Sequence, residues 1–171
     1  RPSSFLEVEG AREVGIEFHS LSKTCNMTGW RVGWACGNKD LVGALAKVKS
    51  NIDSGIFPAV QLAGVAAIKG QDEHIRKMCA MYQRRRDCLV DGLNALGWNI
   101  KKPSATFYMW SKIPGKDNSI DFAGKLLEKA DIVATPGVGF GAYGEGYIRF
   151  AITVDVKRIE EAVARIKKAK L

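Results

Sequence analysis

The sequence predicts an α/β protein with two lobes, in which one long helix leads from a mixed lobe into a smaller α+β lobe. Before residue 71, two strand-like stretches are followed by two helical ones. Apolar residues then recur at steps of three and four through 72–96, which is the pattern of one continuous amphipathic helix. After Gly97, short strand-like and helical stretches follow one another again. Together these three observations predict the fold class.

The composition of the 171 residues is that of a globular protein with excess positive charge. Hydrophobic residues make up 46% and charged residues 26% of the chain, and the net charge is +8. The cations are dispersed, and the densest run, Arg84–Arg86, lies in a helical pattern where a solvated helix face is expected. We therefore expect no nucleic-acid partner, although a basic protein attracts acidic small molecules. No apolar run approaches the ~18 residues of a membrane span, so no membrane segment is expected.

The chain contains four cysteines: Cys25, Cys36, Cys79 and Cys88. None forms a CxxC pair, and with only two histidines the sequence shows no metal-ligand spacing, so no metal site is expected. Reduced thiols in a cytoplasmic protein are the expected state. The first residue is Arg1 rather than Met, and no basic-then-apolar signal peptide follows it. We expect the chain to be a piece of a longer protein.

The first lobe begins with two strand-like stretches. Val14, Ile16 and Phe18 alternate with polar residues within 12–20, which predicts a strand. Residues 30–37, "WRVGWACG", are rich in aromatic and small residues and predict a second short strand.

Two helices are expected after these strands. Apolar residues share one face of 38–50, which predicts an amphipathic helix. The segment "NIDSGIFP" at 51–58 contains turn residues and a proline that interrupt helical structure. A helix of small residues is expected over 59–70, with Gly70 as its C-terminal cap.

The long helix is expected over 72–96, with Asp72 as its N-terminal cap and Gly97 at its end. Its length makes it a candidate for the connection between the two lobes. The chain thus divides into 1–71, a connecting helix at 72–97, and a C-terminal domain at 98–171.

The C-terminal domain is expected to follow the order β-β-α-β-β-α. The expected strands are 98–102, 106–113, 131–137 and 146–153, and the expected helices are 119–130 and 156–170. Asp155 or Thr153 would cap the last helix.

The stretch "GFGAYG" at 139–144 matches the dinucleotide-binding pattern GxGxxG. That mechanism needs a helix directly after the glycines, because the helix N-terminus receives the pyrophosphate. Here a predicted strand follows. The glycines therefore indicate a tight loop, or one that lets a ligand approach the backbone closely.

The stretch "HSLSKTCNMTGWRVG" at 19–33 places Lys23 among small polar residues, with Arg31 eight positions later. A lysine that attacks a carbonyl needs a lowered pKa, which burial or a nearby cation such as Arg31 can provide. Hydroxyl groups and a guanidinium suit a phosphate. A phosphate-bearing aldehyde, pyridoxal phosphate, fits both requirements. On residue chemistry alone, a surface lysine in a turn remains the stronger alternative.

The segment "SLSKTCNMTGWRVG" resembles the lysine signature of the class I and II aminotransferases, which have the fold-type I architecture of pyridoxal phosphate enzymes. Ser three residues before Lys, Arg eight after it, and Gly two beyond Arg agree together. The resemblance implies that Lys23 forms the Schiff base and moves the substrate's α-proton. It implies that Ser20 and Arg31 hold the phosphate, with Ser22 in a supporting role among the cofactor-binding residues.

A second segment, "ATPGVGFGAYGEGYIRFAIT" at 134–153, is similar to the C-terminal part of the same family. In that family an arginine on the last strand binds the substrate's α-carboxylate, and the matching residue is Arg149. A guanidinium pairs with a carboxylate through two hydrogen bonds, which fixes the substrate's orientation. The alternative is a cation on an edge strand that forms a local ion pair.

The resemblance extends from about Arg12 to the end of the chain and implies the C-terminal portion of a fold-type I enzyme. The expected parts are the end of the large cofactor-binding domain at 1–71, the long helix, and the small domain at 98–171. Within the family, the residues around Lys23 are most similar to the LL-diaminopimelate aminotransferases and the aspartate-type branch. Cys25, however, stands where an aromatic residue is expected.

The implied activity is transfer of an amino group between an amino acid and a 2-oxo acid through pyridoxal phosphate. A lyase, decarboxylase or racemase of the same fold type stays open, because Lys23 would serve each of them. The resemblance also implies a homodimer, in which Ser54 or Gly55 could reach the partner's cofactor. The family residues that stack on the cofactor ring or contact its nitrogen have no counterpart in this chain, so we expect it to be nearly inactive alone.

Overall fold

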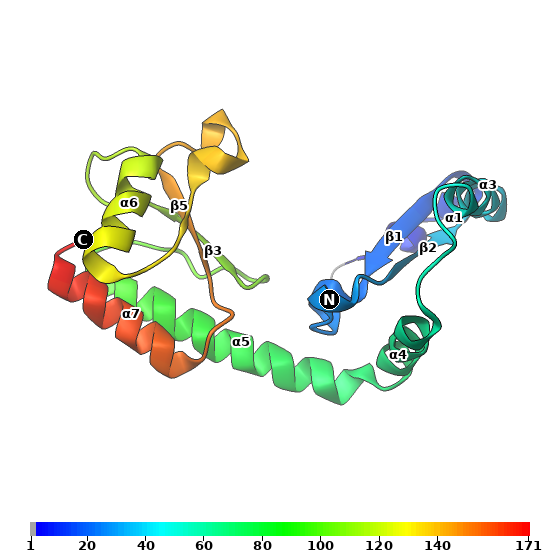
Figure 1. Cartoon of the computed structure of the whole chain (residues 1–171), viewed down its shortest axis with the longest axis horizontal. Coiled ribbons are helices and arrows are strands. Elements are labelled where there is room, and N and C mark those ends of the chain that lie inside the picture. The colour runs from blue at the N-terminus through cyan, green and yellow to red at the C-terminus, as the bar shows by residue number, and fades with distance from the viewer. Residues whose placement is uncertain (1–2) are drawn as a thin grey trace. The chain divides into compact units, whose positions relative to one another are not determined.

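The computed structural model describes residues 3–171 and divides into two compact units (Figure 1). Unit 1 is Arg1–Lys77 and unit 2 is Met78–Leu171. Their boundary falls inside helix α5 (Gln71–Asn94). The domains 1–71, 72–97 and 98–171 stay a prediction. Within the described residues, no helix is both long enough and apolar enough to cross a membrane.

Unit 1 contains one antiparallel strand pair and several helices. Its elements are α1 (Ala11–Val14), β1 (Ile16–Ser20), α2 (Leu21–Thr24), β2 (Gly33–Gly37), α3 (Lys39–Ser50) and α4 (Pro58–Lys69), with 3₁₀ turns at Phe5–Glu7 and Thr28–Trp30. In the strand pair, Ile16 lies opposite Gly37 and Ser20 lies opposite Gly33. The stacked rings of His19 and Trp34, whose centroids are 4.9 Å apart, support this register across the two strands.

The predicted first strand was too long at its N-terminal end. Residues 11–14 form a single helical turn, because Gly10 precedes it with a left-handed φ of 75° and the N–H of Gly15 bonds back to the carbonyl of Ala11. Val14 is 75% exposed, so its place in the alternating pattern was accidental. The second strand likewise begins at Gly33 rather than at residue 30, because a 3₁₀ turn precedes it.

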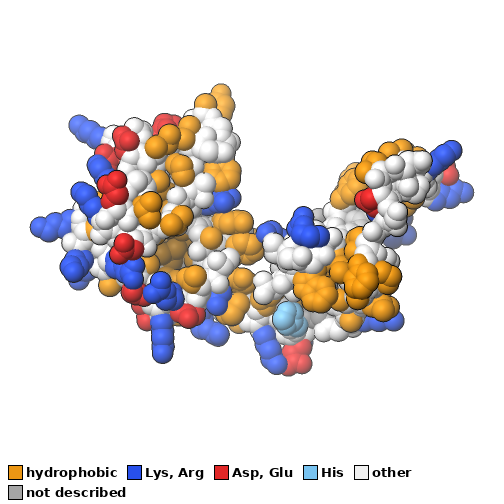
Figure 2. Space-filling model, viewed as in Figure 1, with side chains coloured by type: hydrophobic (Ala, Val, Ile, Leu, Met, Phe, Trp, Pro, Cys, Tyr) orange, Lys and Arg blue, Asp and Glu red, His pale blue; other side chains and the backbone are white. Residues whose placement is uncertain are grey.

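The two predicted helices of unit 1 are confirmed as α3 and α4. Asn38 caps α3, since its side-chain oxygen accepts from the N–H groups of Asp40 and Leu41. Pro58 is the first residue of α4, a position where its missing N–H costs nothing. Gly64 is the buried residue of α4, and large apolar side chains of this helix lie at the surface of unit 1 (Figure 2).

Unit 2 is a three-stranded antiparallel sheet packed with helices. Its elements after α5 are β3 (Tyr108–Lys112), α6 (Ser119–Ala130), β4 (Thr135–Pro136), β5 (Tyr147–Ala151) and α7 (Val156–Ala169), with 3₁₀ turns at Gly137–Phe140 and Ala142–Gly144. The strand order is β3-β5-β4, so β5 is central. Asp155 caps α7, which confirms one of the two predicted caps.

The core of unit 2 lies among the sheet, α6, α7 and the C-terminal part of α5. Fifteen buried apolar residues contribute to it, and Leu93, Leu126, Ile148 and Ile166 are fully buried. Helices α5 and α7 pack closely at Gly92, where an added Cβ atom would lie 2.9 Å from Val163 methyl groups.

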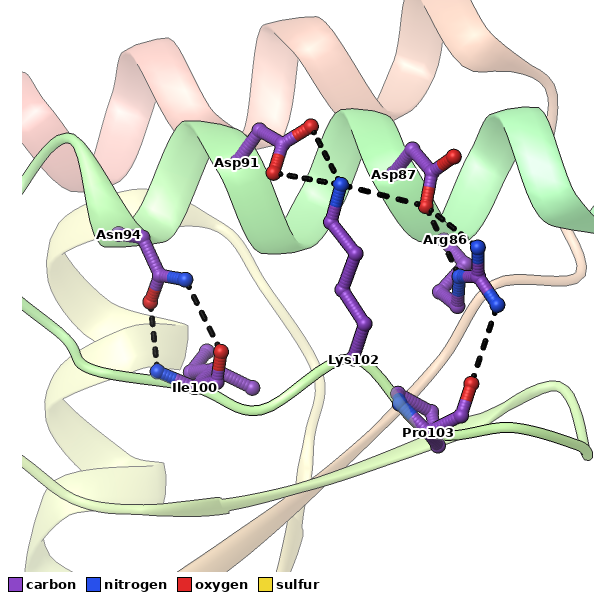
Figure 3. A network of polar contacts seen from close by, with 7 residues as sticks. All are labelled: Arg86, Asp87, Asp91, Asn94, Ile100, Lys102 and Pro103. Carbon is purple, nitrogen blue, oxygen red and sulfur yellow. Dashed lines mark hydrogen bonds and ion pairs between the residues drawn. The ribbon is translucent and has the colours of Figure 1, made fainter.

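Two predictions at the ends of α5 need correction. The helix begins at Gln71, so Asp72 lies in its first turn rather than at the cap. Residues 98–102 do not form a strand, so the observed order is β-α-β-β-α. The Asn94 side chain donates to the carbonyl of Ile100 (2.9 Å) and accepts from its N–H (2.6 Å), which occupies the groups that a strand would pair (Figure 3).

Ion pairs hold the same segment against α5. Lys102 lies 2.8 Å from a carboxylate oxygen of Asp91 and 3.4 Å from one of Asp87 (Figure 3). Arg86 donates to the carbonyl of Pro103 at 3.1 Å. The hydrogen bond that Lys102 donates to Asp91 is the largest cause of the raised pKa of Lys102. The hydrogen bond that Arg86 donates to Asp87 is the largest cause of the lowered pKa of Asp87. The segment is therefore fixed by side chains of one helix instead of by a neighbouring strand.

Candidate functional site

The candidate cofactor site of unit 1 begins where β1 ends. Ser20 is the last residue of β1 and the N-cap of α2, and its hydroxyl oxygen accepts a hydrogen bond from the N–H of Ser22 at 3.1 Å. The hydroxyl proton of Ser20 can still be donated, because capping uses only the oxygen. Lys23 follows in the same short helical turn and is exposed.

Thr28 connects the lysine turn to the arginine. Its hydroxyl donates to the carbonyl of Ser22 at 2.9 Å, while its own carbonyl accepts from the Arg31 Nη1 at 3.0 Å. Ser22 is 8% exposed, and its N–H and carbonyl both take part in these contacts. The backbone of Ser22 thus helps to shape the turn, and its supporting role at the cofactor stays a prediction.

The backbone of Arg31 is strained, with φ of 53° and ψ of 49° in the left-handed region. For a residue with a Cβ atom this conformation costs about 1 kcal/mol or more, and such residues cluster at functional sites. The N–H of Leu21 bonds to the carbonyl of Val32 at 3.2 Å and so helps to hold this segment in place. The structure therefore brings Ser20, Ser22, Lys23 and Arg31 into one hydrogen-bonded segment.

The glycine of the signature has a structural cause. Gly33 lies opposite Ser20 in the strand pair, and an added Cβ atom would lie 2.4 Å from the carbonyl oxygen of His19. No side chain fits in that space, so glycine lets the strand that follows Arg31 pair directly with the strand that leads to Lys23. This pairing sets the arginine beside the lysine turn.

A small apolar cluster lies under the lysine turn. Leu21, Cys25 and Met27 are buried together, with Ala63 and Ala67 of α4 packed against them. Burial raises the pKa of the Cys25 thiol, so this cysteine is a packing residue rather than a reactive one. The position at which the family resemblance led us to expect an aromatic residue therefore faces the interior of unit 1.

Arg149 belongs to unit 2 and lies on the central strand β5, opposite Trp110 of β3 and Thr135 of β4. Its guanidinium carbon lies 4.2 Å from the centroid of the Tyr108 ring and 4.3 Å from that of Phe140. Within the described residues no carboxylate forms an ion pair with it. The alternative of an edge-strand cation with a local ion pair is therefore wrong.

The glycine-rich loop beside Arg149 folds back on itself. Gly137 and Gly144 touch through their backbones, because a Cβ atom on either would lie about 2 Å from the carbonyl oxygen of the other. The loop leads into strand β5 rather than a helix, so the dinucleotide interpretation of "GFGAYG" is excluded.

Glu145 fixes this loop to the start of α6. Its carboxylate accepts from the N–H of Ser119 at 2.7 Å, from the Ser119 hydroxyl at 3.2 Å, and from the N–H of Gly146 at 2.7 Å. These hydrogen bonds, with that of the Ser119 N–H the largest cause, lower the pKa of Glu145.

Comparison with known proteins assigns the family. The model of the aminotransferase class I and II family matches residues 4–166 of the chain. The chain belongs to the class I and II aminotransferases. The family resemblance predicted from the sequence is therefore confirmed, and so is the C-terminal portion of a fold-type I enzyme as the fold class.

The curated relatives of this aminotransferase chain include LL-diaminopimelate aminotransferases. The chain is 54% identical over 167 residues to that of Desulforudis audaxviator and 56% identical over 168 residues to that of Syntrophobacter fumaroxidans. Each match covers 98% of this chain and 43% of the relative. The chain thus spans less than half the length of the relatives it matches, and corresponds to their C-terminal part.

Solved aminotransferase-family structures share the fold. The substrate-bound structure of BacF from Bacillus subtilis has a TM-score of 0.93 and 38% identity, and the match covers 99% of this chain and 44% of that one. The aspartate aminotransferase of Thermus thermophilus with maleate has a TM-score of 0.82 and 30% identity, covering 90% of this chain and 41% of that one.

Sequence reasoning passed over three residues that contact the predicted site residues, one in unit 1 and two in unit 2. Thr28 carries the hydrogen bonds between the lysine turn and Arg31, while Tyr108 and Phe140 surround Arg149. Thr28 could have been singled out as the hydroxyl residue between Lys23 and Arg31. The two aromatic residues carried no signal, because they lie 41 and nine positions from Arg149 along the chain.

Proposed function

We propose that this chain contributes the lysine side of the active site in a pyridoxal phosphate-dependent aminotransferase. The enzyme would transfer an amino group between an amino acid and a 2-oxo acid. The observation that carries this proposal is the segment from Ser20 to Arg31, in which two hydrogen bonds of Thr28 hold the lysine turn and the arginine together. Because the chain belongs to the class I and II aminotransferases, we expect this segment to bind the aldehyde and the phosphate of pyridoxal phosphate.

The residues of this segment fit the phosphate and aldehyde of pyridoxal phosphate. Ser20 retains a hydroxyl proton to donate, and Arg31 uses one N–H group on Thr28 and has others for phosphate oxygens. Lys23 is exposed and supplies the only amine within this segment for the aldehyde. When bound, the cofactor would act as the electron sink for the broken substrate bond.

The chain's own residues then divide the work of the reaction. Lys23 takes the proton from the substrate's α-carbon and returns a proton later, which requires a neutral amine in part of the cycle. Arg149 pairs with the substrate's α-carboxylate and so orients the α-carbon. Ser20 and Arg31 keep the phosphate fixed while these groups move.

For the substrate we propose LL-diaminopimelate, because relatives that are 54–56% identical carry that name. An aspartate-type donor is the alternative, supported by the likeness to an aspartate aminotransferase solved with maleate. Both donors carry two carboxylates. A positively charged chain, with a net charge of +8, attracts aspartate and 2-oxo acids, which are net anions, whereas the two ammonium groups of diaminopimelate balance its two carboxylates.

We further propose that the enzyme is a cytoplasmic homodimer in which the turn at Ser54 and Gly55 approaches the partner's cofactor. In support, Gly55 has a left-handed φ of 106° and donates its N–H to Asp53, which gives the turn a defined shape. Phe57 after this turn is 72% exposed, as expected of a residue that a partner covers. The free cysteines agree with a reducing compartment.

The first experiment locates the cofactor. The protein is saturated with pyridoxal phosphate, reduced with borohydride and digested, and the modified peptide is identified by mass spectrometry. We expect one pyridoxyl group on Lys23, retained in the control Lys39→Ala and absent in Lys23→Ala. Label on another lysine, or label that survives Lys23→Ala, would reject the assignment.

The second experiment identifies the reaction. The chain is assayed alone and together with a polypeptide that covers the remaining length of the Desulforudis audaxviator relative. With LL-diaminopimelate and 2-oxoglutarate we expect glutamate from the pair and almost none from the chain alone. Carbon dioxide, ammonia without glutamate, or a racemised amino acid would favour the decarboxylase, lyase or racemase alternative. A normal turnover rate from the chain alone would contradict the expected dependence on other segments.

A further inference from the structure

Two aromatic rings hold the Arg149 guanidinium in unit 2. Tyr108 is the first residue of β3, and Phe140 is the last residue of the 3₁₀ turn Gly137–Phe140. The guanidinium carbon lies 4.2 Å from one ring centroid and 4.3 Å from the other, both well inside the ~6 Å range of cation–π attraction. Segments from two different parts of unit 2 therefore converge on one cation.

These contacts use the faces of the rings and leave the N–H groups of the guanidinium unused. Ring faces attract the cation electrostatically but do not take its in-plane N–H groups as a carboxylate does. Within residues 3–171, no hydrogen bond or ion pair engages the Arg149 side chain. A partly buried arginine is normally paired, so one held by rings alone is prepared for a ligand that brings its own anion.

Each ring is itself held in place. The hydroxyl oxygen of Thr106 accepts a hydrogen bond from the backbone N–H of Tyr108 at 3.3 Å. Thr106 itself has a left-handed φ of 73°, and this contact fixes the start of β3. The Phe140 ring packs edge-on against Trp110, with centroids 5.6 Å apart. The Trp110 ring in turn stacks on Tyr147. Rotation of the Tyr108 ring away from Arg149 would break its contact with the Phe107 ring, whose centroid lies 4.6 Å away, and rotation of the Phe140 ring would break its contact with Trp110.

The glycine-rich loop accounts for the position of Phe140. The close backbone approach of Gly137 and Gly144 closes the loop, and the carboxylate of Glu145 ties it to α6. Phe140 lies between these two points of attachment. The "GFGAYG" stretch, whose glycines predicted a tight loop, thus serves to place one phenylalanine ring on Arg149.

We propose that Tyr108 and Phe140 are positioning residues that hold the Arg149 guanidinium in a fixed orientation for a carboxylate of the substrate. This inference rests on the proposed function for the identity of the substrate, but the geometry stands without it. Holding the side chain in advance removes part of the ordering cost that a free arginine would pay on binding. Loss of either ring should therefore weaken carboxylate binding while the charge of Arg149 is unchanged.

The test uses the 171-residue chain labelled with ¹⁵N, without cofactor. The Arg149 Nε–H signal is assigned by its absence in Arg149→Lys, and succinate is titrated as the probe, with the neutral succinamide as its matched control. In the wild type we expect a ring-current-shifted signal that moves with succinate and not with succinamide. In Tyr108→Leu and in Phe140→Leu the shift should be lost and succinate affinity should fall about fivefold.

Conservative and matched variants separate positioning from general damage. Tyr108→Phe keeps a ring and should behave as the wild type. Tyr143→Leu removes a fully exposed aromatic residue of the same loop and should change neither reading. Phe140 is 52% exposed, so its replacement should leave the backbone amide spectrum of β3 and β5 intact even if Tyr108→Leu does not fold. Equal succinate affinity in Phe140→Leu and Tyr143→Leu would overturn the proposal. It would also be overturned if succinate did not shift the Arg149 Nε–H signal of the wild type.

The outcome is distinguishable from failure of the proposed function. If the protein lacks transaminase activity but Arg149 responds to succinate through both rings, the positioning role stands and only the reaction is wrong. If transamination occurs and Phe140→Leu raises the KM for the amino acid no more than Tyr143→Leu does, the positioning role is wrong and the reaction stands.

Discussion

Single residues of the lysine signature have separable tasks. In the proposed function, Ser20, Lys23 and Arg31 would carry the groups that a phosphate-bearing aldehyde requires, whereas Gly33 and Thr28 shape the backbone between them. The spacing of the motif depends on these two residues. Gly33 is required because the carbonyl of His19 occupies the space of a side chain.

Replacing Gly33 by alanine should therefore destabilise unit 1. The new Cβ atom would lie 2.4 Å from a backbone oxygen, and only separation of β1 from β2 relieves the clash. We expect a loss of about 2 kcal/mol or more, as for overpacked sites, measured by urea unfolding. Gly29→Ala is the matched control, because nothing lies within 4 Å of its Cβ position. Equal stability of the two variants would contradict the pairing of these strands.

At the scale of elements, carboxylate and amide side chains decide how helices and loops begin. Asn38, Asn118 and Asp155 each cap the helix that follows them. Glu145 plays a similar part from a distant position in the sequence. Its carboxylate accepts a hydrogen bond from the N–H of Ser119, the first residue of α6, which lies 26 positions away. The glycine-rich loop and α6 are thereby one structural element.

The Glu145 contact should make the stability of unit 2 depend on pH. Hydrogen bonds lower the folded-state pKa below the ordinary 4.5, so the contribution is complete above pH 4.5 and is lost as the pH falls through the folded-state value. We expect Glu145→Gln to be less stable than the wild type at pH 7, with a difference that shrinks below pH 4.5. Urea unfolding across this range measures it. A difference that stays constant with pH would show that the carboxylate's charge plays no part.

At the scale of the whole molecule, the two units differ in how much apolar surface they bury. Unit 2 encloses fifteen buried apolar residues, while the cluster in unit 1 contains three. A two-stranded sheet is marginal alone, and α4 buries little more than Gly64. Phe18, Phe57 and Leu62 of unit 1 are each more than 65% exposed.

Hydrogen exchange of the chain should therefore show two levels of protection. Amides of β3 and β5 should exchange only through global opening of unit 2, and those of β1 and β2 should exchange faster by at least ~tenfold. Leu126→Ala, at a fully buried position, should cost unit 2 about 2–5 kcal/mol and accelerate exchange in β3 and β5. Equal protection of both strand pairs in the unmodified chain would contradict this difference in packing.

The sequence by itself determined the elements whose signals are local. Periodicity predicted helices over 38–50, 119–130 and 156–170, which the structure has as Lys39–Ser50, Ser119–Ala130 and Val156–Ala169. The resemblance of the segment from Ser20 to Gly33 to a known signature predicted the family. These signals are readable because helix formation and turn chemistry depend on neighbours within a few positions.

Only the tertiary structure decided what depends on distant partners. Residues 98–102 look like a strand, but the Asn94 side chain bonds to both the N–H and the carbonyl of Ile100, and the sequence pattern of 98–102 does not show this contact. The contact of the Tyr108 ring with Arg149 joins residues 41 positions apart in the sequence. A hydrogen bond or ring contact forms wherever the packed chain brings two groups together, so its partner cannot be read from either residue alone.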